Sequence, residues 1–398
     1  MRSGLRVNSS IEAGWLRSIW LCLENQLGEG CSPSFVAKPM LIFIGFISFL
    51  IAGGLVWLQW TRATSLGLYD VPKSHSSHSV TVPSGGGLGL MFGLFAGVSL
   101  AVWRTGDSNL LLPFLPLLPV AVVSLVDDFR SLPAVLRLFV QGGAALWVVN
   151  LGGNRTLDLA FLGMGASSLL ISSILAIGGM LLICNIFNFM DGIDGFAGTQ
   201  ALISGLLLVV FVNDPLVRVW GIGIAGASVG FLLLNWHPAK IFLGDIGSVS
   251  LGFALASLPI LGSRGQGKEI LFWIVVSMWF FLIDGISTLV RRLFEGEKLW
   301  KSHRTHFYQR WANSGVRHST VCLWIHCGGA VLIYIPLGVL FVLGVNVTGR
   351  AAVAIVLSLG YFLALRKLVP RRFGVEPVTP NDGNVLERPE VSESIAQE

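Results

Sequence analysis

Long apolar runs recur along most of this sequence and constrain its fold more than any other feature. Of its 398 residues, 53% are hydrophobic and only 12% are charged, whereas soluble domains carry about 25% charged residues. An apolar run of about twenty residues can cross a bilayer as an α-helix, because a helix satisfies its own backbone hydrogen bonds. About eleven such runs predict an all-α, polytopic integral membrane protein. The expected spans are 40–60, 86–104, 109–126, 134–151, 167–187, 198–213, 216–235, 246–262, 269–291, 320–345 and 349–366.

The positions of these runs divide the chain into three regions. Residues 40–366 form the predicted transmembrane domain. In residues 1–39 the apolar stretch Trp15–Leu23 is too short to span a bilayer, so we expect a non-essential N-terminal extension. Residues 367–398 are rich in Pro, Glu and Ser and are expected to form a disordered tail. The five cysteines contain no C-x-x-C pair and indicate neither a disulfide framework nor a zinc site.

Basic residues are concentrated in alternate loops. The loops after the odd-numbered spans, with the tail, hold Arg62, Lys73, Arg130, Lys240, Arg291, Arg292, Lys298, Lys301, Arg304, Arg310, Arg317, Arg366, Lys367, Arg371 and Arg372. The other loops hold only Arg104, Arg155, Arg218, Arg264, Lys268 and Arg350. By the positive-inside rule the first set is cytoplasmic.

The most informative polar stretch is Asn185–Gly198, which follows the apolar run Leu169–Cys184. Its polar members, Asn185, Asn188, Asp191 and Asp194, recur at every third position. On an α-helix this spacing spreads them over half of the surface, whereas on a 3₁₀ turn they share one face. In either case two carboxylates and two carboxamides meet at one membrane edge.

Other reactive groups fall on the same predicted side. Asp127, Asp128 and Asp245 are there, and a basic run, His303–Arg310, follows in a later loop. With Asp191 and Asp194 they make five carboxylates, which repel one another unless a cation balances them, and Mg²⁺ with its hard oxygen ligands suits that need. Arginine and histidine side chains can bind phosphate oxygens.

Carboxylates for a metal, cations for a diphosphate and a membrane setting indicate phosphoryl transfer from a soluble donor to a lipid acceptor. The triple glycine Gly85–Gly87 either cradles phosphate or is a flexible join. A cation-coupled transporter is the alternative from another class. It would carry its carboxylates in mid-span, and the sequence shows no inverted repeat or broken mid-span pair.

Four spaced motifs carry a resemblance to a known family. They are Asp70-x-Pro…His78…Pro83 with the glycines, Val126-Asp127-Asp128, the Asn185–Gly195 repeat together with Phe242-Leu-Gly-Asp245-x-Gly-Ser248, and His303-Arg304-x-His306. Over residues 40–366 the sequence resembles the polyprenyl-phosphate N-acetylhexosamine-1-phosphate transferases of glycosyltransferase family 4. These include the enzymes that start O-antigen and common antigen, and the phospho-N-acetylmuramoyl-pentapeptide transferase of peptidoglycan synthesis.

The resemblance implies transfer of a sugar-1-phosphate from a UDP-sugar to undecaprenyl phosphate, with release of UMP. It implies a Mg²⁺ ion, for which Mn²⁺ is a substitute, bound by Asp245 with Asn188. Asp127 or Asp128 would act on the lipid phosphate as base or nucleophile. The substrate-binding residues would be Asp191, Asp194, His303, Arg304, His306, Lys73 and His78.

Two departures bear on the substrate. His75 stands where many relatives have Arg, and the last motif reads H-R-T-H-F-Y-Q-R, without the histidine-rich form of the pentapeptide transferases. This favours an O-antigen or capsule initiating enzyme, using an N-acetylhexosamine or a deoxy-N-acetylhexosamine, over the muramoyl-pentapeptide alternative. The expected partners are the UDP-sugar, undecaprenyl phosphate and membrane lipid. A homodimer is compatible with the sequence, and no nucleic acid is expected to bind. The expected location is the bacterial inner membrane, with the active site facing the cytoplasm.

Overall fold

The protein is all-α, as predicted. The computed structural model describes residues 38–63, 69–70, 81–152, 169–262, 266–297 and 305–373. The helices are α2 (Lys38–Thr61), α4 (Gly87–Thr105), η1 (Ser108–Leu111), α5 (Phe114–Phe129), α6 (Ala134–Gly152), α7 (Leu169–Phe189), α8 (Phe196–Phe211), α9 (Pro215–Asn235), α10 (Gly244–Leu261), α11 (Gly267–Ser277), α12 (Trp279–Phe294), α13 (Phe307–Asn313), α14 (His318–Gly329), the π-helical turn η4 (Ala330–Tyr334), α15 (Ile335–Val342) and α16 (Val347–Phe373). A two-stranded hairpin, β1 (Tyr69–Asp70) and β2 (Val82–Pro83), follows α2.

Each of the eleven predicted spans falls on helix, but they are not equally able to cross a bilayer. Within the described ranges, nine helices are long and apolar enough, and the bent pair α11–α12 makes ten. The remaining predicted span, 198–213, falls on α8, which is a shorter apolar helix. The helix surfaces carry exposed large apolar side chains such as Phe43, Leu118 and Phe139, as expected for faces that contact lipid.

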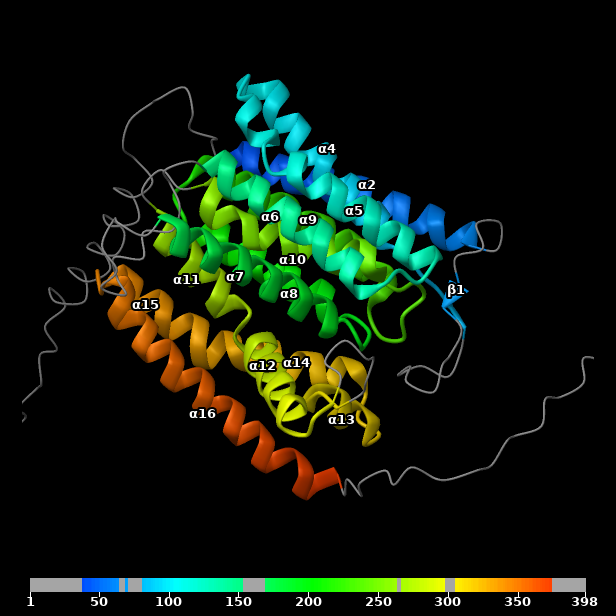
Figure 1. Cartoon of the computed structure of the whole chain (residues 1–398), viewed down its shortest axis with the longest axis vertical. Helices are drawn as coiled ribbons and strands as arrows, with labels where there is room; N and C mark the ends of the chain where they lie inside the picture. The colour runs from blue at the N-terminus through cyan, green and yellow to red at the C-terminus, as the bar shows by residue number, and fades with distance from the viewer. Residues whose placement is uncertain are drawn as a thin grey trace, which may run out of the picture.

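Helix α10 lies at the centre of the first part of the fold (Figure 1), where it packs against α4, α5, α6 and α7. Its apolar window is 89% buried, more than that of any other candidate span described. The approach of α4 is close because both helices present glycine. A Cβ atom on Gly87 would lie only 2.3 Å from the Cα atom of Gly247. This contact fixes the end of α10 that begins with Gly244 and Asp245.

The ninth predicted span, 269–291, is not one straight helix. It breaks at Met278 into α11 and α12, which are bent by 72°. Polar side chains from neighbouring helices stabilise the break: Gln200 and Tyr334 both donate to the carbonyl of Ser277, at 3.0 and 2.9 Å. The expectation of no broken span is therefore wrong. The groups that bond to the carbonyl at this bend are the neutral side chains of Gln200 and Tyr334, not the carboxylates that a cation transporter would place there.

The C-terminal helices form a second group, in which α12, α13, α14, α15 and α16 lie together (Figure 1). Helix α16 continues to Phe373, past the predicted domain boundary at 366. On the end of the molecule away from the aspartates, Arg350 of α16 forms two bonds of 2.7 and 2.6 Å with Glu269 of α11. Residues 1–37 and the tail beyond 373 lie outside the described residues, so those expectations stay predictions.

Candidate active site

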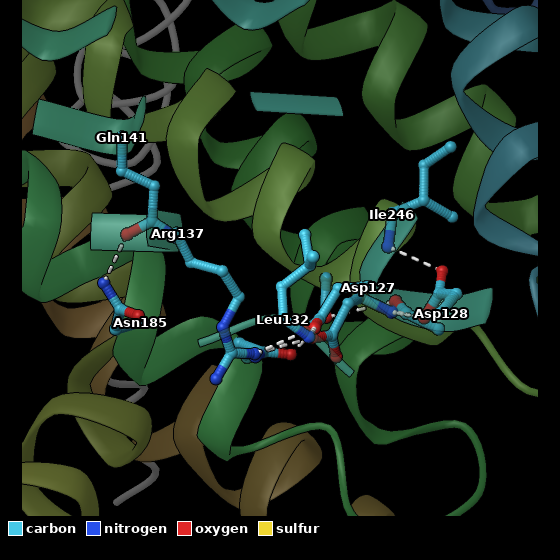
Figure 2. Close-up of polar contacts among 11 residues, drawn as sticks. Asp127, Asp128, Leu132, Arg137, Gln141, Asn185 and Ile246 are labelled. Carbon is cyan, nitrogen blue, oxygen red and sulfur yellow. Dashed lines mark hydrogen bonds and ion pairs between the residues drawn. The ribbon is translucent and has the colours of Figure 1, made fainter. Parts of the chain in front are cut away.

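Two of the predicted site carboxylates converge on one arginine. Asp127 ends α5, Asp245 begins α10, and Arg137 lies in the first turns of α6. Arg137 Nη1 is 2.6 Å from Asp127 Oδ2 and 3.1 Å from Asp245 Oδ2. Figure 2 shows the Arg137 side chain reaching toward Asp127, which also accepts a hydrogen bond from the backbone N–H of Leu132. The two carboxylate oxygens thus face a single point that a cation already fills.

Asp128, the neighbour of Asp127, has a different environment. The backbone N–H groups of Asp245 and Ile246 donate to its Oδ1 and Oδ2, at 2.7 and 3.1 Å. Figure 2 shows the bond from Ile246. These are first-turn donors of α10 with no partner inside that helix, so Asp128 caps the helix and complements the positive end of its dipole. Because of this cap, Asp128 holds Asp245 in place.

The Asn185–Asp194 repeat is divided between two kinds of backbone. Helix α7 continues in α-helical hydrogen bonding to Met190, and the Asp191 N–H then donates to the Asn188 carbonyl, a tighter 3₁₀-type bond of 3.1 Å. Asn188 accepts a bond of 2.6 Å from the Ser248 hydroxyl of α10. Asn185 instead donates to Gln141 of α6 at 2.8 Å (Figure 2). The repeat is therefore α-helical through Met190 and turns into a 3₁₀-type bond at Asp191.

Asp191 lies in the turn after α7, and the next residue is a glycine for steric reasons. A Cβ atom on Gly192 would lie 2.3 Å from the Tyr308 hydroxyl oxygen, which donates to the Phe189 carbonyl at 3.1 Å. Burial, helped by the neighbouring carboxylates of Asp128 and Asp194, raises the pKa of Asp191 to about 7. Asp191 is therefore partly protonated at neutral pH.

Asp194 is held by groups from two other segments. Its Oδ2 lies 2.6 Å from His237 Nδ1 and 3.3 Å from His318 Nδ1, and it accepts from the Ala239 N–H at 3.2 Å. Burial acts to raise the pKa of Asp194, but the bonds from His318, His237 and Ala239 outweigh it and leave the pKa below its ordinary value. Gly195 follows with φ of +76°, a left-handed conformation that opens α8 and suits glycine.

His306 is buried, 1% exposed, although it was expected to contact substrate. It precedes α13, where the backbone N–H groups of Phe307 and Tyr308 donate to the buried Asp284 carboxylate at 2.9 and 3.2 Å. His306 Nδ1 lies 3.8 Å from the same carboxylate. The structure thus places His306 in the anchor of α13, and through Tyr308 this anchor reaches the turn that carries Asp191.

Two of the three glycines in Gly85–Gly87 have their N–H groups bonded to protein carbonyls. Gly86 and Gly87 donate to the carbonyls of Phe242 and Leu243, at 2.9 and 2.8 Å. These bonds join the start of α4 to the segment before Asp245. Gly86 and Gly87 therefore hold the start of α4 against the segment before α10. They are neither a phosphate cradle nor a flexible join, the two interpretations offered by the sequence.

Four predicted substrate-binding residues lie outside the described residues. They are Lys73, His78, His303 and Arg304. The other predicted site residues belong to elements whose ends meet at one end of the helix bundle; they are Asp127, Asp128, Asn188, Asp191, Asp194, Asp245 and His306.

Sequence reasoning missed four residues that shape this end of the molecule. Arg137 and Asp284 are charged residues inside predicted spans, and an intramembrane charge is itself a signal of function or of a structural pair. His237 and His318 gave no such signal, because a single histidine in a polar loop or at a helix start is common. Only the fold brings them to Asp194.

The fold and these contacts define a multi-pass membrane protein with a carboxylate-rich site at one end of its helices. Comparison with known proteins agrees. The family model of glycosyl transferase family 4 matches residues 110–263. A phospho-N-acetylmuramoyl-pentapeptide-transferase of Synechococcus elongatus is 31% identical over 313 residues, covering 73% of this chain and 81% of that protein.

Two further relatives carry other names. A probable undecaprenyl-phosphate N-acetylglucosaminyl 1-phosphate transferase of Bacillus subtilis is 26% identical over 276 residues, covering 68% of this chain and 76% of that protein. A decaprenyl-phosphate N-acetylglucosaminephosphotransferase of Mycobacterium tuberculosis is 29% identical over 305 residues, covering 66% of this chain and 74% of that protein. The chain belongs to glycosyl transferase family 4.

Proposed function

We propose that the protein transfers an N-acetylhexosamine-1-phosphate, or its deoxy form, from a UDP-sugar to undecaprenyl phosphate and releases UMP. The observation that carries the proposal is the convergence of Asp127 and Asp245 on one cation position, in a chain whose relatives are named for polyprenyl phosphates. The expected setting is the bacterial inner membrane, with this end facing the cytoplasm. The product would begin an O-antigen or another cell-surface polysaccharide.

The donor set at this end fits Mg²⁺. Asp245 at the start of α10 offers carboxylate oxygens, and the carboxamide of Asn188 lies beside α10 through its bond to Ser248. Hard oxygen ligands, few of them from protein, are what Mg²⁺ prefers, and Mn²⁺ shares this preference. When bound, the ion would neutralise charge on the donor diphosphate and polarise the phosphorus that is attacked.

The structure supports a division of labour between Asp127 and Asp128. Asp128 has both oxygens on backbone N–H groups of α10, so we assign it to positioning. Asp127 faces Asp245 and Arg137, and we assign it to the acceptor phosphate. There it would take up the proton that a phosphate monoester still carries in part near pH 6.

The reaction then balances as a single displacement. An oxygen of the acceptor phosphate forms a bond to the sugar-bearing phosphorus, the bond between the two donor phosphates breaks, and UMP leaves with that electron pair. Asp191 and Asp194 would contact the nucleotide. Lys73, His78, His303 and Arg304 would bind the phosphates. His306, being buried, would act by holding α13.

A second candidate is the same transfer with a UDP-muramoyl-pentapeptide donor. The specific observation in its favour is the relative of that name at 31% identity. The H-R-T-H-F-Y-Q-R motif, which lacks the histidine-rich form, favours the hexosamine donor. The transporter alternative is set aside, because the chain belongs to a transferase family.

The test is a donor panel with purified protein in detergent, undecaprenyl phosphate and Mg²⁺. The panel contains UDP-N-acetylhexosamines, their deoxy forms and the UDP-muramoyl-pentapeptide. We expect equal amounts of UMP and lipid-linked sugar diphosphate, identified by mass spectrometry, with a hexosamine donor. Lipid product only with the pentapeptide would select the second candidate. Absence of lipid product with every donor, across Mg²⁺ and Mn²⁺ titrations, would refute the function.

A further inference from the structure

Asp194, His237 and His318 form a group of potential metal ligands, and the proposed chemistry uses neither of the two histidines. Their ligating atoms, a carboxylate oxygen and two imidazole nitrogens, all lie within 4.8 Å of one another. They come from the turn before α8, the loop before α10 and the first residue of α14. Three segments far apart in sequence therefore point ligand atoms at one place.

We propose that these three residues form a second metal site, selective for a transition metal of the zinc class. Two imidazoles and one carboxylate are ligands typical of Zn²⁺ and Co²⁺, whereas Mg²⁺ prefers oxygen alone. The chemistry of this group thus differs from that of Asp127 and Asp245, which offer only oxygens.

The distances allow such an ion with a small adjustment. With metal–ligand bonds of about 2.0–2.1 Å, tetrahedral ligand atoms are separated by about 3.3–3.4 Å. Asp194 Oδ2 and His318 Nδ1 are already 3.3 Å apart. Asp194 Oδ2 and His237 Nδ1 are 2.6 Å apart, a hydrogen-bond distance that must open by roughly 0.7 Å to meet that geometry.

His318 also directs its Nδ1 nitrogen into the group. This nitrogen lies 3.3 Å from the Asp194 backbone nitrogen and 3.3 Å from Asp194 Oδ2, so it must give up any hydrogen it carries when an ion binds. His237 Nδ1 must be the donor toward the carboxylate, since an ionised carboxylate can only accept. An incoming ion would replace this one hydrogen.

The surroundings leave a path for entry. The side chains of Asp194 and His318 are 11% and 16% exposed, and that of His237 is 30% exposed. A metal with three protein ligands keeps a fourth position for water or another ligand. Bound here, it would tie the α7–α8 turn and the α9–α10 loop to the start of α14.

The test uses the full chain, without a polyhistidine tag, in detergent with millimolar Mg²⁺ throughout. Co²⁺ serves as the probe, because tetrahedral Co²⁺ gives intense visible absorption that octahedral Co²⁺ lacks. We expect one equivalent of Co²⁺ to give that spectrum, Zn²⁺ to displace it, and Zn²⁺ to raise the thermal unfolding temperature. His237→Gln and His318→Gln should each weaken binding at least ~10-fold, the lower bound seen even for changes outside the ligand shell.

Asp245→Asn is the matched control. It changes the oxygen-only site and should keep the Co²⁺ spectrum. In a separate unfolding measurement with and without Mg²⁺, both histidine variants should keep the stabilisation by Mg²⁺, which shows that they fold. The proposal is overturned if the tetrahedral spectrum is absent, if both histidine variants bind Co²⁺ like the wild type, or if Asp245→Asn abolishes binding. None of these readouts depends on turnover, so failure here leaves the transferase proposal standing.

Discussion

Arg137 stands between two carboxylates, and its removal gives a quantitative test of the site. Arg137 Nη1 contacts Asp127 Oδ2 and Asp245 Oδ2 at 2.6 and 3.1 Å, so those oxygens are at most about 5.7 Å apart. At this largest separation two unit charges repel by about 3 kcal/mol at an effective dielectric constant of 20 and by about 0.7 kcal/mol in water, and a shorter separation increases both energies. The Arg137 side chain is 32% exposed, so we expect a cost between these limits in Arg137→Gln.

The assay is thermal unfolding in detergent at pH 8, followed by tryptophan fluorescence, with EDTA or with saturating Mg²⁺. In EDTA the variant should be less stable than the wild type, because its two carboxylates have lost their counter-charge. Mg²⁺ should stabilise the variant more than the wild type, since the ion takes over the role of the guanidinium and binding to the native state adds stability.

Arg130→Gln is the matched control, because Arg130 has the same charge, follows α5 at the same end and is exposed. It should lose little stability in either condition. The reasoning is refuted if Arg137→Gln shows the same deficit in EDTA and in Mg²⁺, or if Arg130→Gln reproduces it.

Three further predictions address neighbouring residues. Asp245→Asn should lower kcat at least ~100-fold, as when one well-placed electrostatic stabiliser is lost, with partial recovery in excess Mg²⁺; a UMP-release assay with near-wild-type turnover would refute the metal assignment. Gly192→Ala should cost about 1–3 kcal/mol, because its Cβ would meet the Tyr308 hydroxyl at 2.3 Å, whereas Gly178→Ala in α7, with open space around it, should not; equal unfolding temperatures would contradict this. The pKa of Asp191, about 7 in the folded protein, lies above the unfolded value of about 3.9. The stability that the protonated Asp191 carboxyl contributes is therefore fully present below pH 4 and is lost as pH rises to about 7. Asp191→Asn should flatten this decline of the unfolding free energy in metal-free measurements, and an unchanged slope would disprove it.

The membrane architecture was predictable from the sequence because it depends on composition and run length. Every predicted span falls on helix, and the polar motifs within the described residues meet at one end. The break at Met278 was not predictable, since the 269–291 run contains no proline and the break is stabilised by Gln200 and Tyr334 from distant helices. A window of local sequence cannot contain those partners.

The gathering of the described polar residues at one end was predictable, but their individual environments were not. Asp127 and Asp128 are adjacent in sequence and chemically identical, yet only the latter meets the first N–H groups of α10. That difference depends on where a helix more than a hundred residues later begins. The same reason hid His237 and His318, whose place beside Asp194 is set by loops that carry no distinctive pattern.

The enclosure of α10 has a consequence for how the protein is made. This span has the lowest mean hydropathy of the candidate spans described, 1.4, and the highest buried share, 89%, so it gains little from lipid and much from protein. Most of its packing is against α4, α5, α6 and α7, which are synthesised before it, and α11 is added afterwards. During translation α10 therefore follows the helices that form most of its surroundings, and its packing against them brings Asp245 to Asp127. A nascent chain that stops before α10 holds half of the carboxylate pair, so the site comes into being only at this late step of biogenesis.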